Sequence, residues 1–181
     1  MKRYTTFDII LIAMMAALGI ATKPIIVPLT HIITGPLFIP GGTVAGGIYM
    51  MWIVLGGALI QKRGTATLIG LVQGIIVLVT GVYGTHGVAS IVTYTLPGLA
   101  IDILWLIKRS RGGSLMDCFL AGITANLTGT YLSNLVFFKL PLIPLVISLS
   151  SGALSGGIGG VIAYNIIKKI NNMKKLGGNK S

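Results

Sequence analysis

Acidic residues are almost absent from this chain of 181 residues, which contains no Glu and only three Asp. Asp8, Asp102 and Asp117 form neither a paired-carboxylate motif nor a DxxD metal cluster in the sequence. General acid-base hydrolysis by two carboxylates and metal chemistry at clustered acids both need such groups close together. The sequence therefore argues against both kinds of site.

Reactive motifs are equally scarce. The single cysteine, Cys118, excludes an intramolecular disulfide and a CxxC metal or redox site. Ser151 and His86 have no third group to activate a nucleophile, and neither HExxH nor a Walker A sequence occurs. We therefore expect a protein that is not an enzyme, with no metal and no cofactor. ATP hydrolysis, if it is needed, must come from another subunit.

Charged residues make up 9% of the chain and hydrophobic ones 54%, a balance far from that of soluble domains. Crossing roughly 30 Å of hydrocarbon takes about 20 residues of helix. Because the sequence has no alternating strands of the kind that form a barrel, each span must be a helix, which hydrogen-bonds its own backbone amides. We predict an all-α membrane protein with six transmembrane helices, at about 7–27, 42–61, 64–82, 88–107, 115–138 and 143–168. Residues 1–170 then form one six-helix domain, and 171–181 a polar, basic, frayed cytoplasmic tail.

The basic residues alternate between the gaps that separate these segments. Twelve of the fourteen fall at the termini and in every second gap: Lys2, Arg3, Lys62, Arg63, Lys108, Arg109, Arg111, Lys168, Lys169, Lys174, Lys175 and Lys180. Only Lys139 lies in the other gaps, and Lys23 near the end of the first segment. The positive-inside rule places both termini in the cytoplasm. A net charge of +11 spread over short loops indicates anionic lipid headgroups as the partner, and not nucleic acid.

The longest outer gap, residues 28–41, contains Pro28, Pro36 and Pro40, which favour a folded loop or a half-inserted cap over a helix. Lys23, near the outer headgroups, is predicted to snorkel, and Asp102 to pair with a basic residue at the inner boundary. Glycines recur in the second and sixth segments, including a Gly152-xxx-Gly156-xxx-Gly160 pattern. Such small residues favour close packing of neighbouring helices.

Polar uncharged side chains gather in the outer halves of the later segments. Asn126, Thr130 and Asn134 share one helical stripe, as do Ser148, Ser151 and Ser155; the remaining candidates are Gln73, Tyr83, His86, Ser90 and Tyr94. Such groups avoid lipid, so they face protein, water or a ligand. Excepting Ser155, we predict that these residues line a substrate pocket open to the outside. Interhelical hydrogen bonding is the alternative that the pattern leaves open.

The first segment has a separate feature, an alanine strip at Ala13, Ala17 and Ala21. A four-residue spacing puts the three methyl groups on one helical face. The strip is either an internal packing surface or a docking surface for a helix of another subunit.

Together these features resemble the substrate-binding S components of energy-coupling factor (ECF) vitamin transporters, over about residues 7–170. The resemblance rests on six helices with both ends inside and on the alanine strip. Three stretches look most like the thiamin/hydroxymethylpyrimidine-type group: Gly35-Pro36, Gly46-Gly47-Ile48-Tyr49-Met50-Met51-Trp52, and Lys62-Arg63-Gly64-Thr65-Ala66.

The resemblance implies a multi-pass protein of the prokaryotic cell membrane that captures a vitamin or precursor for an ECF-type ABC transporter. Its partners would be a transmembrane coupling (T) subunit, which docks on the alanine strip, and two ATPase subunits. The ionisable groups of the outer half, Lys23, His31, His86 and Lys139, suit a neutral or anionic ligand, which favours hydroxymethylpyrimidine over the thiamin cation. Two alternatives stay open: a small membrane scaffold without a small-molecule ligand, and a membrane-embedded enzyme of lipid metabolism.

Overall fold

The computed structural model of the protein describes residues 3–37, 39–81, 87 and 89–177, and within these ranges it contains helices and turns but no strand. The α-helices are α1 (Thr6–Thr34), α2 (Gly41–Ile60), α3 (Thr65–Thr80), α4 (Ala89–Ile107), α5 (Leu115–Ser133) and α6 (Leu142–Gly177). A 3-10 turn, η1 (Gly35–Leu37), follows α1, and a π-helical turn, η2 (Asn134–Phe138), extends α5. Within this part of the chain, α1, α2, α4 and α6 are long and apolar enough to cross a membrane, and α3 is a shorter apolar helix. The predicted all-α class is confirmed.

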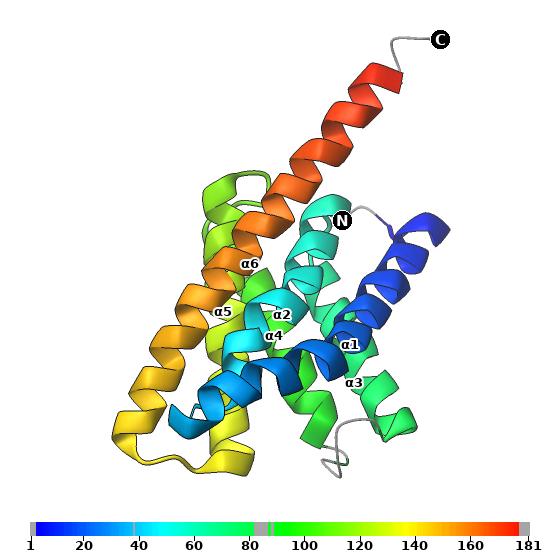
Figure 1. Ribbon diagram of the computed structural model, residues 1–181. Helices are drawn as coiled ribbons and strands as arrows, with labels where there is room; N and C mark the ends of the chain where they lie inside the picture. Colours follow the sequence, from blue (N-terminus) through cyan, green and yellow to red (C-terminus); the bar gives the residue numbers. More distant parts are fainter. Residues whose placement is uncertain (1–2, 38, 82–86, 88, 178–181) are drawn as a thin grey trace.

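The first helix is longer than predicted, because α1 continues through Pro24 and Pro28 to Thr34. The prediction of a loop from residue 28 is therefore wrong for its first part. A proline inside a helix removes one hydrogen bond and bends the helix, but tertiary contacts can keep the helical turns on both sides. Here the Thr30 hydroxyl donates to the Gly41 carbonyl at 2.9 Å, which ties the second half of α1 to the start of α2. Figure 1 shows α1 bending near its middle, so that its second half runs across the bundle.

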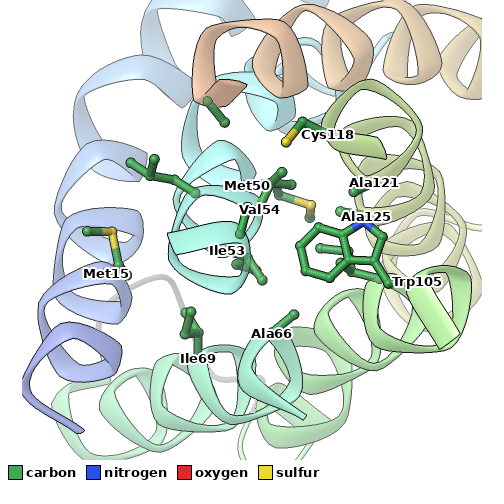
Figure 2. Packing of buried hydrophobic residues seen from close by; sticks show 14 of the residues in the cluster. Met15, Met50, Ile53, Val54, Ala66, Ile69, Trp105, Cys118, Ala121 and Ala125 are labelled. Atoms are coloured by element: carbon green, nitrogen blue, oxygen red, sulfur yellow. The ribbon is translucent and has the colours of Figure 1, made fainter. Parts of the chain in front are cut away.

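The second helix lies at the centre of the bundle and packs against α1, α3, α5 and α6. Figure 2 shows Ile53 and Val54 of α2 surrounded by Met15 of α1, Ile69 of α3 and Trp105 of α4. All five side chains are buried. The same core includes Ala121 of α5 and Ala163 of α6, so it fixes the positions of helices α1 to α6.

Glycines let the backbones of α2, α5 and α6 come into direct contact. A methyl group added at Gly47 of α2 would overlap the Ser155 carbonyl of α6, and one added at Gly156 would overlap the Gly122 carbonyl of α5. Gly159 faces the Gly47 carbonyl in the same way. The predicted role of the glycines in close helix packing is confirmed.

Ion pairs close the end of the bundle where α2 stops. Asp8 closes a capping box with Thr5 and pairs with Lys62, while Asp117 pairs with Lys108 at 2.8 Å. The sequence predicts that Asp102 pairs with a basic residue as well. Instead, its Oδ2 accepts hydrogen bonds from the Thr67 backbone amide at 2.8 Å and from the Thr67 hydroxyl at 2.6 Å. That prediction is wrong because the first turn of α3 presents an unpaired amide to the carboxylate.

The last helix runs well beyond the predicted span. α6 continues to Gly177, so the predicted start of a frayed tail at residue 171 lies inside the helix. Figure 1 shows its C-terminal part projecting away from the other helices, at the same end of the bundle as the N-terminus. Residues 178–181 lie outside the described part of the chain.

Candidate functional site

A cavity of about 360 Å³ lies at the end of the bundle where α2 begins. Its walls come from α1, α2, α4, α5 and η2: Lys23, Val27, His31, Pro40, Gly41, Gly42, Thr43, Tyr49, Thr93, Tyr94, Gly129, Thr130, Ser133, Phe137 and Phe138. A smaller extension of about 40 Å³ continues from it into the bundle, between Gln73, Ile53 and Pro97. The volume is within the usual range for pockets that hold a small organic molecule.

Lys23 is the central charged group of this cavity and lines both parts of it. Its ammonium donates to the Tyr94 hydroxyl at 2.5 Å, and it lies 4.3 Å from the centre of the Tyr94 ring and 5.0 Å from that of Tyr49. The prediction that Lys23 snorkels towards the headgroups is therefore wrong. The side chain turns inward because two aromatic faces stabilise the cation there.

Neighbouring hydrogen bonds hold this group of side chains in place. The Tyr49 hydroxyl donates to the Gly42 carbonyl at 2.9 Å, which ties the ring back towards the start of α2. The Trp52 indole donates to the Thr22 hydroxyl at 2.9 Å, which fixes α1 against α2 beside Lys23. The lysine and its two tyrosines are thus positioned before any ligand arrives.

The remaining wall combines hydroxyls with aromatic rings. Thr43, Thr93, Thr130 and Ser133 supply hydroxyl groups that both donate and accept, and Phe137 and Phe138 supply apolar faces. No Asp lines the cavity within the described part of the chain, whereas Lys23 and His31 do. Such a wall suits an aromatic ligand with several hydrogen-bonding groups that is neutral or anionic.

Three of the residues predicted from the sequence lie together at this cavity. Tyr94 and Thr130 line its main part, and Gln73 lines the inner extension. The Thr130 hydroxyl is buried and has no hydrogen-bond partner among the described residues. Its oxygen lies towards Gly152 of α6, so it reaches a ligand in the cavity only when the adjoining wall moves.

Other predicted residues lie away from the wall. Asn126 is fully buried, and its amide donates to the Thr43 carbonyl at 3.0 Å and the Gly152 carbonyl at 2.7 Å. Asn134 accepts from the Leu140 amide at 2.8 Å and shapes the turn after α5. These two asparagines hold helices and turns in position.

The predicted serines are also outside the lining. Ser90 and Ser148 are buried, and the Ser151 hydroxyl donates to the Ser148 carbonyl within α6 at 3.0 Å. Tyr83 and His86 belong to the segment between α3 and α4 that lies outside the described residues.

The alanine strip of α1 faces outward. Ala13, Ala17 and Ala21 are all exposed, whereas Ile12 and Ala16 of the same helix are buried against the bundle. Of the two interpretations that the sequence left open, internal packing is therefore excluded for these three side chains in the isolated chain.

The sequence placed Lys23 wrongly, and it did not predict six other polar or aromatic wall residues: Thr43, Tyr49, Thr93, Ser133, Phe137 and Phe138. A lysine inside an apolar helix was the available signal, because an intramembrane cation is a functional candidate by default. The aromatic residues gave no such signal, since they are equally common facing lipid.

The model of a family described as "ABC-type cobalt transport system, permease component" matches residues 7–128. Among solved structures, a "Crystal structure of an S-component of ECF transporter" superposes with a TM-score of 0.72 at 19% sequence identity, covering 99% of this chain and 99% of that chain. At this identity the superposition shows a shared fold. No curated protein matches the chain.

Proposed function

Because the chain belongs to the family of permease components of ABC-type cobalt transport systems, we propose that it is the substrate-binding S component of an ECF transporter. The observation on which this depends is the cavity of about 360 Å³ with Lys23 held between Tyr49 and Tyr94. A preformed cavity of this size, with a largely apolar wall and a few polar groups, is what a binding subunit needs, and a scaffold does not need one.

The topology that we propose has six membrane crossings with both termini in the cytoplasm. The Tyr4 hydroxyl donates to the Arg63 carbonyl at 2.8 Å, which puts the N-terminus beside the basic α2–α3 turn. The basic α4–α5 turn lies there too, since Arg111 donates to the Gln61 carbonyl at 3.3 Å. By the positive-inside rule this end faces the cytoplasm, so the cavity at the opposite end faces the outside.

Energy for uptake comes, in this proposal, from a T subunit and two ATPase subunits, because the chain has no nucleotide-binding motif of its own. The exposed alanine strip, Ala13, Ala17 and Ala21, is the contact with the T subunit. Small side chains let two membrane helices approach closely without a hydrophobic driving force. The chain itself binds and releases substrate and forms no covalent bond.

For the substrate we propose a water-soluble vitamin or precursor, with hydroxymethylpyrimidine as the first candidate. A neutral pyrimidine would stack on Tyr49 or Tyr94 and hydrogen-bond to the Thr130 and Ser133 hydroxyls. The thiamin cation fits less well, because Lys23 puts a positive charge in the wall.

The family description raises cobalt as an alternative substrate. A bare divalent ion is bound by several His, Cys or carboxylate ligands. Within the described residues no three such side chains lie together, and Lys23 would repel the ion. His86 lies outside that part of the chain. The cavity wall that is described favours an organic ligand.

Native mass spectrometry of the gently purified protein, followed by a thermal-shift screen, tests the proposal. The screen contains B-group vitamins, their precursors including hydroxymethylpyrimidine, thiamin and Co²⁺. We expect a retained organic ligand and stabilisation by one of these compounds that saturates with concentration. A protein that retains nothing and responds to none of them would favour the scaffold interpretation instead.

A further inference from the structure

A second cavity, of about 320 Å³, lies at the opposite end of the bundle. It lies between the α2–α3 turn and the α4–α5 turn, and Arg63, Arg109 and Arg111 line it. Gln61, Lys62, Asp102 and Ser110 complete its polar wall. The proposed substrate function makes no use of this cavity, because it opens at the end away from Lys23.

The acids near this cavity are already engaged in structural contacts. Asp8 pairs with Lys62, and Asp102 accepts two hydrogen bonds from Thr67. The two ion pairs found among the described residues involve Lys62 and Lys108, so neither Arg63 nor Arg109 has a carboxylate partner there. Both arginines are exposed. The cavity therefore presents an excess of positive charge to an incoming anion.

An apolar surface continues from the cavity along α4. Leu106 lines the cavity and is 53% exposed. Ile103 and Leu99, at 46% and 38% exposed, lie one and two turns further into the membrane-crossing part of the same helix face. A ligand that occupies both regions has an anionic head and a long apolar tail.

We propose that this cavity binds an anionic phospholipid, with Arg63 and Arg109 on the headgroup phosphate and an acyl chain along Leu106, Ile103 and Leu99. Guanidinium groups bind phosphate oxygens in a bidentate manner, and basic pockets at the cytoplasmic ends of membrane helices bind acidic headgroups. A free phosphate ion would bind the same arginines but could not at the same time occupy the apolar surface of α4 beside the cavity. The lipid is thus the ligand that accounts for both observations.

The test uses the whole protein in nanodiscs of phosphatidylcholine with a minority of phosphatidylglycerol. Native mass spectrometry counts the phosphatidylglycerol that the released protein retains. We expect preferential retention by the wild type and an approximately fivefold weaker retention in Arg63→Gln and in Arg109→Gln. The matched control is Lys168→Gln/Lys169→Gln, which removes exposed charges of α6 outside the cavity and should leave retention unchanged.

Two further measurements distinguish a lipid from free phosphate, and a lipid from an acidic protein segment. Leu106→Ser should reduce lipid retention, whereas inorganic phosphate alone should not stabilise the detergent-purified protein. Stabilisation by phosphate equal to that by lipid would overturn the lipid assignment, and so would equal losses in the α6 control. Unchanged retention in both arginine variants, combined with lost assembly with the ATPase-bearing partners, would identify the cavity as a contact for an acidic protein segment. None of these outcomes depends on whether the outer cavity binds a vitamin.

Discussion

The Lys23 ammonium donates a 2.5 Å hydrogen bond to the Tyr94 hydroxyl and so joins α1 to α4 across 71 positions of sequence. A lysine charge at the centre of a membrane helix costs roughly 2.5–3.5 kcal/mol. The contacts with the two tyrosine rings, at most about 2 kcal/mol each, and the hydrogen bond to Tyr94 offset a cost of this size and leave little net gain. The lysine is therefore not needed for folding, and its place in the cavity wall points to ligand binding.

Replacing this lysine should separate stability from function. We expect Lys23→Met to unfold at the same temperature as the wild type or higher, because a costly charge is removed from the helix interior. Ligand affinity should fall about 10–100-fold, the loss of one hydrogen bond from a charged donor. Isothermal titration with the compound found in the screen measures the affinity. The control is Lys139→Met, which removes an exposed cation at the same end of the bundle but outside the cavity wall, and this variant should bind the ligand normally. Equal affinity in the two variants would contradict the role of Lys23.

Larger side chains on the outward face of α1 should block assembly with the T subunit and leave ligand binding unchanged. Ala13→Leu or Ala17→Leu adds volume to an exposed strip, so the bundle itself is undisturbed. We expect uptake by the assembled transporter to be abolished while the detergent-purified variant binds ligand as the wild type does. Ser150→Leu adds a leucine to an exposed position of α6 and should leave uptake intact. Loss of ligand binding in the alanine variants would argue that the strip supports the bundle and not a partner.

The helices and the glycine contacts could be predicted because both follow from local rules. A helix in lipid must hydrogen-bond its own backbone groups, so the apolar runs give the bounds of α2, α3, α4 and α5 to within a few residues, whereas α1 and α6 continue past their predicted ends. The glycines of α6 predicted close packing, which Gly156 and Gly159 show against α5 and α2. The end of α1 was missed because Pro28 is compatible with either a loop or a bent helix, and the Thr30–Gly41 contact that decides between them joins two helices.

The candidate site was predictable in part. Three predicted residues line the cavity or its extension, each from a different helix: Gln73 of α3, Tyr94 of α4 and Thr130 of α5. Asn126 shares its face with Thr130 but lies deeper, where its amide reaches two backbone carbonyls before it could reach a ligand. The direction of Lys23 depends on two tyrosines from other helices, and no pattern within one segment contains that information.

The contact between α5 and α6 should be sensitive to a single methyl group. In Gly156→Ala the new Cβ would overlap the Gly122 carbonyl, which is backbone and moves only with its helix. We expect a loss of about 1–3 kcal/mol, the usual cost of overpacking a tight interface, seen as a lower unfolding midpoint in detergent. Gly113→Ala is the control, since nothing lies within 4 Å of its added methyl. An unchanged midpoint in Gly156→Ala would mean that the two helices are further apart than described.

Asn126 and Thr130 lie one helical turn apart, and we expect them to differ in what they stabilise. Asn126→Ala removes two interhelical hydrogen bonds, so the ligand-free protein should lose about 1–3 kcal/mol of stability with little change in affinity. Thr130→Val keeps the shape of a side chain whose hydroxyl has no partner among the described residues, so stability should hold while affinity falls about 2–10-fold. Thermal unfolding without ligand, paired with a dissociation constant for each variant, measures both effects. The opposite assignment, with Asn126→Ala weakening binding and Thr130→Val lowering stability, would place the ligand deeper between α2, α5 and α6 than the cavity wall indicates.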